Sequence, residues 1–182
     1  MRAIRAVGLA LAVAGISAAP VAAKTAAAVP LTSVLQKSEF PSDTRWIAWP
    51  MRAEELFTLE RLGTAPRRGA SFATSIPVGQ GSETVGGFLI EFPSKAHARK
   101  GFALMRATMK PLTPFAAPRF GDAQVTNLKR GPAPRAEVLV LRNRTVWSIW
   151  AGAEVFYAIS VARARSDLVK YAGLQQQHIG GG

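Results

Sequence analysis

The chain has 182 residues, with 23 lysines and arginines against 11 acidic residues, a formal charge of +12 and no cysteine. The lack of thiols excludes disulfides, cysteine nucleophiles and cysteine-ligated metal sites. Its two histidines show no metal-ligand spacing, so we expect no metal ion and no cofactor. With 48% hydrophobic residues, the chain has the composition of one folded domain.

Residues 1–23 have the pattern of a secretory signal peptide. Two arginines precede an uncharged apolar run over 6–16, and Ala23 ends a small-residue motif suited to cleavage. A second such motif would place the cut after Ala28. A retained membrane anchor is the alternative, but Pro20 keeps the apolar run shorter than the roughly 20 residues that a spanning helix needs. The sequence therefore predicts export to the periplasm or the exterior, with no transmembrane segment in the mature chain.

The rest of the chain divides into a tether and one domain. Residues 24–44 mix alanine, serine, threonine and proline with little periodicity, which is typical of a linker. A single domain is expected over 45–179, and the glycine tail at 180–182 is expected to be disordered.

The first half of the domain is predicted to hold two helices and a hairpin. Pro50 suits the first position of a helix over 50–62, which Gly63 would end. Strands at 71–78 and 84–92 flank a glycine-rich turn and predict a hairpin. The second helix is expected over 94–110, with Ser94 as its N-cap and Pro111 as its stop.

The second half is predicted to be mostly strand. The expected elements are strands at 123–130, 136–142, 145–151 and 155–162, then a helix over 167–178 with Ser166 as N-cap. Strands therefore cluster and do not alternate with helices one for one. This order predicts an α+β fold, with an antiparallel sheet of five to six strands and helices packed on one face.

The basic residues are dispersed over several groups, one of which is Lys129-Arg130-Arg135. The helix over 94–110 carries an apolar stripe beside a basic stripe, and two of its cations lie in the first turns, where they oppose the helix dipole. A solvated basic edge, or charge that reflects composition alone, is the alternative. The candidate contacts for an anionic partner are Lys95, Arg99, Arg106, Arg142 and Arg144.

Four tryptophans could form a stacking surface or fill the core. Trp147 and Trp150 differ by three positions in one predicted strand, so their rings should face opposite sides of the sheet. One of them is expected in the core and the other outside it, but the spacing does not say which.

Catalytic motifs are missing: the chain has no nucleophile elbow and no glycine-rich phosphate loop before a helix. We therefore expect no catalytic residue. The rival hypothesis is a hydrolase with a carboxylate pair, which requires two acidic side chains within about 5–10 Å of each other. The acidic residues considered for that pair are Glu54, Glu83, Glu91, Asp122 and Glu137.

Three segments resemble those of small exported bacterial α+β domains of unassigned function: a strand followed by an alanine-rich helix over 86–105, and two turn motifs. The turn motifs are Phe120-Gly121-Asp122-Ala123 and the hairpin tip Arg142-Asn143-Arg144-Thr145, and the similarity covers about residues 84–178. The tip lacks the glycine that such domains often have. The resemblance implies the fold and export, a structural role for the Gly-Asp pair, and no catalytic residue.

These observations predict an exported, non-enzymatic, envelope-associated binding or accessory protein. Its partner would be anionic or amphipathic: an anionic membrane surface, a cell-wall polymer or another envelope protein. Export argues against nucleic acid. A structural subunit of an envelope complex is a further alternative, and a large contiguous apolar patch would indicate it.

Overall fold

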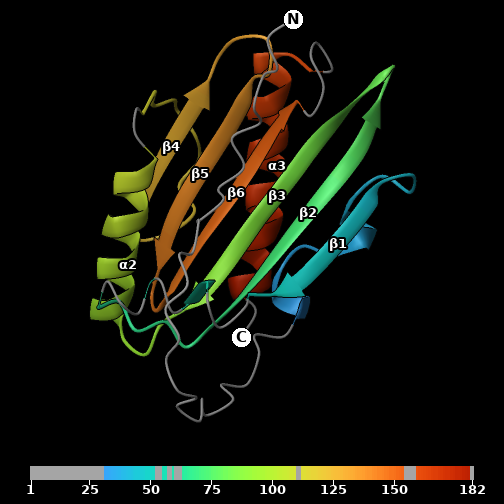
Figure 1. Cartoon of the computed structure of the whole chain (residues 1–182). Coiled ribbons are helices and arrows are strands. Elements are labelled where there is room, and N and C mark those ends of the chain that lie inside the picture. The colour runs from blue at the N-terminus through green and yellow to red at the C-terminus, as the bar shows by residue number, and fades with distance from the viewer. Residues whose placement is uncertain are drawn as a thin grey trace, which may run out of the picture.

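The structure is a computed structural model, and it describes residues 31–51, 55–56, 59, 63–109, 112–153 and 159–180. The predicted leader, its cleavage near Ala23 and the last two residues of the glycine tail lie outside the described residues. The fold is built on one antiparallel sheet in the order β1-β2-β3-β6-β5-β4 (Figure 1). The six strands are β1 Arg45–Pro50, β2 Arg68–Val78, β3 Gly81–Glu91, β4 Ala123–Lys129, β5 Arg135–Arg142 and β6 Thr145–Ala153.

Two long helices complete the fold. Helix α2 (Lys95–Thr108) links β3 to β4 at the far edge of the sheet, and α3 (Val161–Gly180) follows β6. Two short 3-10 turns, η1 (Leu31–Ser33) and η2 (Lys37–Glu39), precede β1. The α+β class and the antiparallel sheet expected from the sequence are confirmed.

The helices lie on opposite faces of the sheet, which differs from the expected single covered face. Val138 and Val140 on β5 pack in one core cluster with residues of α3, whereas Leu139 and Leu141 pack in a second cluster with residues of α2. Successive strand residues point to opposite faces, so the two clusters lie on the two sides. Figure 1 shows α3 running behind the strands. Burial on both sides explains why residues 138–141 of β5 form a continuous apolar run.

The hairpin β2–β3 and helix α2 form where local sequence signals predict them. Gly79 takes a φ of +57° in the turn between the strands, which glycine adopts without strain. The Ser94 hydroxyl accepts a hydrogen bond from the His97 N–H and caps α2. Ala98 and Phe102 of the predicted apolar stripe are buried against the sheet.

Pro50 ends strand β1 and does not start a helix, which corrects the prediction. The apolar residues Trp46 to Trp49 pair with β2 along a sheet edge, where the missing proline N–H costs least. Of the helix expected over 50–62, the described residues Glu55, Leu56 and Leu59 are helical. The remaining positions, apart from Pro50 and Met51, lie outside the described residues.

Helix α3 begins six residues earlier than predicted. The Ser160 hydroxyl accepts a hydrogen bond from the Arg163 N–H, so Ser160, and not Ser166, caps the helix. The last two positions of the strand expected at 155–162 therefore belong to α3. Residues 155–158 of that expected strand lie outside the described residues.

The segment expected to be a linker contributes to the core from Val34 onward. Val34 and Leu35 are fully buried, and Phe40 stacks on Tyr171 of α3 with ring centroids 4.7 Å apart. The buried Gln175 of α3 accepts a hydrogen bond from the Leu35 N–H at 3.2 Å and donates one to the Ser33 carbonyl at 2.7 Å.

We expect the substitution Gln175→Leu to lower the free energy of unfolding by about 1–3 kcal/mol, because two buried backbone groups lose their partner while the side-chain volume stays similar. Thermal or urea unfolding measures the change. Gln177→Leu, at an exposed position of the same helix, is the matched control and should change stability by less than about 0.5 kcal/mol. Equal effects of the two substitutions would show that the segment before β1 is not anchored through Gln175.

His178, about one turn further along α3, holds the same segment. Its Nδ1 lies 3.0 Å from the Thr32 carbonyl and its Nε2 lies 2.9 Å from Glu39 Oε1. Both partners are acceptors, so the charged imidazole, in which both ring nitrogens donate, is the form that these two contacts favour. Burial alone would lower the pKa of His178, but the hydrogen bonds to Glu39 and Thr32 raise it overall.

The Gly-Asp pair is structural, as the resemblance implies. Asp122 Oδ2 accepts a hydrogen bond from the Asn143 N–H at 2.9 Å, in the turn between β5 and β6. A Cβ at Gly121 would lie 2.5 Å from the Leu141 carbonyl oxygen, so only glycine fits there. Asn143 takes a φ of +53°, which asparagine tolerates in place of the missing glycine. The two resembling turn motifs thus meet in space.

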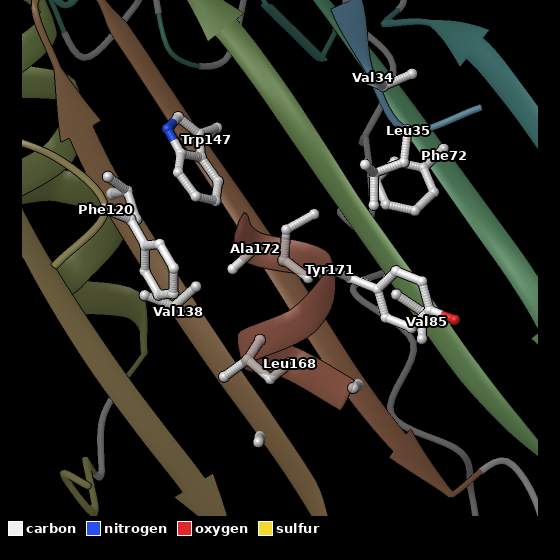
Figure 2. Packing of buried hydrophobic residues seen from close by; sticks show 14 of the residues in the cluster. Val34, Leu35, Phe72, Val85, Phe120, Val138, Trp147, Leu168, Tyr171 and Ala172 are labelled. Carbon is white, nitrogen blue, oxygen red and sulfur yellow. The ribbon is translucent and has the colours of Figure 1, made fainter. Parts of the chain in front are cut away.

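Trp147 is the largest fully buried side chain and lies at the centre of the core under α3 (Figure 2). It packs edge-on against Phe120 with ring centroids 6.2 Å apart. Trp150 is half-buried on the opposite face of the sheet. The predicted placement of the two rings on opposite sides is confirmed, and the buried member is Trp147.

Candidate functional site

A concave site lies where the C-terminal end of α2 meets the paired ends of β4 and β5. The cavity has a volume of about 600 Å³, within the range of small-molecule sites. We call it the basic pocket. Its lining residues are Thr108, Met109, Thr113, Asn127, Leu128, Lys129, Arg130, Arg135 and Glu137.

Three cations surround this pocket, and one carboxylate accompanies them. Lys129 and Arg135 are direct cross-strand partners at the end of the β4–β5 ladder. Like charges directly opposite each other in a sheet are unfavourable. Among the described residues, no ion pair involves Lys129 or Arg130. The pocket therefore presents an excess of positive charge that an anionic ligand group would offset.

The carboxylate in the pocket is oriented and does not neutralise the site. Glu137 Oε1 accepts a hydrogen bond from the buried Ser148 hydroxyl at 3.3 Å. Its Oε2 lies 3.7 Å from Arg135 Nη2, which is an ion pair but too long for a hydrogen bond. The Arg135 side chain is 45% exposed. Among the described residues, none accepts a hydrogen bond from its side-chain N–H groups, so these donors face a ligand.

Trp150 does not line the pocket, but it contacts the lining residue Arg135. The Arg135 guanidinium carbon lies 4.9 Å from the centroid of the Trp150 ring, a cation–π arrangement. Trp150 is the direct cross-strand partner of both Glu137 and Gly86. A Cβ at Gly86 would lie 2.6 Å from Trp150 Cε2, so the ring lies flat against this glycine.

The candidate contacts from the sequence do not gather at one place. Lys95, Arg99 and Arg106 are exposed on α2. Arg142 is half-buried, and its Nη1 donates to the Gln176 carbonyl of α3 at 3.4 Å. Arg144 is exposed in the β5–β6 turn. The α2 row, defined as Lys95, Arg99 and Arg106, is thus separate from Arg142, which lies on the α3 side of the sheet.

The pocket cations were visible in the sequence only as one of several basic groups. What brings them together is the pairing of β4 with β5 across the Gly131–Pro134 turn. A usable signal did exist, because Lys129 and Arg135 flank that turn, although Arg135 lies one residue before the strand expected at 136–142. Trp150 and Gly86 could not be assigned to the site, because their contact depends on the β3–β6 register.

A second polar cluster lies at the start of α3, where Glu83 is buried, Asp167 is half-buried and Arg163 is exposed. Glu83 is 1% exposed, and its Oε2 accepts from Arg163 Nε at 3.2 Å. Arg163 Nε also lies 3.3 Å from Asp167 Oδ2. Burial raises the pKa of Glu83 to about 7; the charge of Asp167 and a hydrogen bond with it add to the rise, and Arg163 opposes it. Burial, then the charges of Asp167 and Glu83, raise the pKa of Tyr171 to about 12.

The carboxylates proposed for a hydrolase pair do not converge where the structure describes them. Glu91 pairs with Arg68 at 2.6 Å, Asp122 caps the β5–β6 turn, and Glu137 faces the basic pocket. Glu83 meets Asp167, which the sequence did not single out, and neither residue lines the basic pocket. Glu54 lies outside the described residues.

Among the described residues, no three histidine, aspartate or glutamate side chains lie together in a way that could hold a metal ion. None of the described helices has both the length and the apolar character needed to cross a membrane.

No protein-family model matches the chain, and no curated protein matches it. Among solved structures, it is similar to the extracellular domain of PknH from Mycobacterium tuberculosis, with 14% identity and a TM-score of 0.43, over 79% of this chain and 94% of that one. It is also similar to a putative uncharacterized protein from Mycobacterium smegmatis, with 11% identity and a TM-score of 0.36, over 82% of this chain and 97% of that one. At this distance neither likeness bears on function.

Proposed function

We propose that this protein is an exported, non-enzymatic binding module of the cell envelope that holds a phosphate or carboxylate group of an anionic partner in the basic pocket. The observation that carries the proposal is the convergence of Lys129, Arg130 and Arg135 on one cavity, with two of the cations directly opposed across the β4–β5 ladder. Export rests on the leader predicted at residues 1–23.

The chemistry of the pocket favours an oxyanion over an apolar group. Two of its three cations have no ion-pair partner in the described part of the chain, and Glu137 is held by Ser148 beside the third. Thr113 adds a hydroxyl group and Met109 an apolar contact, whereas the Thr108 hydroxyl already donates to the Met105 carbonyl. An anionic lipid headgroup and an anionic cell-wall polymer both supply the oxyanion that these residues would bind.

The test is co-sedimentation of the chain lacking residues 1–23 with phosphatidylglycerol vesicles, phosphatidylcholine vesicles and a phosphate-rich cell-wall polymer, across a salt series. We expect binding to at least one anionic probe, which falls steeply with salt, and none to the neutral vesicles. The double substitution Lys129→Gln/Arg130→Gln should weaken binding about 30-fold, because each cation near an anionic surface contributes about 1 kcal/mol.

Two further double variants separate the pocket from general basicity. Lys37→Gln/Arg45→Gln removes the same charge near β1, at the opposite edge of the sheet, and should reduce binding by less than threefold. Lys95→Gln/Arg99→Gln tests the α2 row. Equal losses in all three variants, or a loss confined to the α2 row, would contradict a pocket site. The absence of binding to every anionic probe at low salt would contradict the function itself.

A further inference from the structure

The contacts of Arg135 differ from those of the other two pocket cations. Its guanidinium is held from one side by the Trp150 ring, and Glu137 stands 3.7 Å from Nη2 without forming a hydrogen bond. In the described part of the chain, the Arg135 side chain makes no hydrogen bond. A guanidinium that is positioned while its donors stay free is suited to a ligand with two oxygens, because it can donate two parallel hydrogen bonds.

The position of Arg135 depends on two residues from other strands. Trp150 of β6 lies between Gly86 of β3 and Glu137 of β5 in one row across the sheet. Any side chain at Gly86 would meet the indole ring, so the glycine lets the ring lie close to the sheet. The ring in turn supports the guanidinium above it. Gly86, Trp150 and Arg135 thus form a continuous stack that ends at the pocket.

We propose that Arg135 is the specificity-determining contact of the basic pocket for an oxyanion with two accessible oxygens, a carboxylate or a phosphate group, and that Trp150, seated on Gly86, is the residue that positions it. The inference rests on the proposed function, since it assigns recognition of the ligand in the basic pocket to Arg135. Lys129 and Arg130 attract the anion through their charge, whereas Arg135 orients it through two parallel hydrogen bonds.

The first test keeps the positive charge at position 135 but removes the pair of parallel N–H donors that a guanidinium provides. Arg135→Lys should weaken binding to the anionic probe about tenfold, because a lysine ammonium is a point charge that cannot form the paired contact. Arg45→Lys, at the other edge of the sheet, is the matched control and should bind as the unsubstituted protein does. If Arg135→Lys also binds as the unsubstituted protein does, the pocket recognises only the negative charge of the ligand, and the specificity role of Arg135 is excluded.

The second test measures the coupling between Trp150 and Arg135 with a double-mutant cycle. Trp150→Leu should weaken binding about three- to tenfold, and Trp150→Phe less, because tryptophan is the strongest cation–π partner. In an Arg135→Gln background, Trp150→Leu should have no further effect on binding. A purely structural role of Trp150 would give the same loss in both backgrounds and would overturn the positioning role.

Gly86→Ala supplies an independent variant, because it displaces the ring without touching Arg135 or the ligand. We expect it to reproduce the loss of binding caused by Trp150→Leu. All variants are compared at temperatures well below their unfolding midpoints, so a folding defect is not counted as a binding defect. If Lys129→Gln/Arg130→Gln abolishes binding while Trp150→Leu and Gly86→Ala leave it intact, the proposed function stands and the positioning stack is refuted.

Discussion

Substituting Trp147 by alanine is expected to lower the free energy of unfolding by about 3–5 kcal/mol, the usual cost of removing a large aromatic side chain from a core. The ring is fully buried, and it lies between Leu89 of β3 and Val140 of β5, its direct cross-strand partners. It also contacts Phe120, which precedes the Gly-Asp turn. The cavity would therefore open at the centre of the larger core cluster. Urea unfolding followed by far-UV circular dichroism measures the loss.

Trp147→Phe should cost markedly less than Trp147→Ala. The indole N–H is buried and has no hydrogen-bond partner among the described residues, so phenylalanine removes an unsatisfied donor while it keeps an aromatic ring. Trp150→Ala, on the half-exposed face, is the comparison and should cost less than half as much as Trp147→Ala. If the two alanine variants were equally unstable, the assignment of Trp147 as the buried tryptophan would be contradicted.

Local signals in the sequence are sufficient to predict those helices and strands whose ends they mark. Ser94 marked the start of α2, and the glycine-rich turn at Gly79 marked the β2–β3 hairpin. β1 was missed because Pro50 fits a helix start as well as the end of an edge strand, and only the pairing with β2 decides between them. The start of α3 was missed because a short apolar run suits strand and helix equally.

The two covered faces and the candidate site depend on contacts between distant residues. Val138, Leu139 and Val140 point alternately to the two faces of the sheet, and all three are apolar. Both faces need apolar residues because α3 covers one face and α2 covers the other. Likewise, Arg135 and Trp150 meet only through the register of β5 with β6. No spacing along the chain encodes that register, because it results from the packing of the whole sheet.

The stability of the protein should fall as the pH rises from about 4.5 to about 7, because of Glu83. Its pKa is raised to about 7 in the folded state, whereas an exposed glutamate titrates near 4.5. Between these values the folded chain binds a proton that the unfolded chain has released, so each step up in pH favours unfolding. The loss amounts to as much as about 3 kcal/mol, at 1.4 kcal/mol per pH unit.

The buried surroundings of Glu83 explain why its proton is retained. Glu83 Oε1 and Asp167 Oδ2 are buried atoms, and the hydrogen bond between the two carboxyl groups needs a proton that one of them keeps. Once both groups are ionised, Arg163 is the cation that contacts both of them. Tyr171 stays neutral throughout, because its pKa is about 12.

The substitution Glu83→Gln is expected to mimic the protonated form, since the amide can accept from Arg163 and donate to Asp167. The variant should match the unsubstituted protein near pH 5 and exceed its stability near pH 8. Urea unfolding at pH 5, 6, 7 and 8 gives both profiles. His178 causes a separate decline in stability with pH. Because the pKa of its imidazole is raised in the folded state, its contribution to the free energy of unfolding is lost as the pH rises through that pKa. The decline due to His178 should persist in Glu83→Gln.

Glu91→Gln makes the same chemical change at a carboxyl group outside the cluster, where Arg68 is the partner. It should leave the slope of stability against pH between 5 and 7 unchanged, and only Glu83→Gln should flatten that part of the profile. If the unsubstituted protein and Glu83→Gln show parallel profiles, the proton is not held at Glu83.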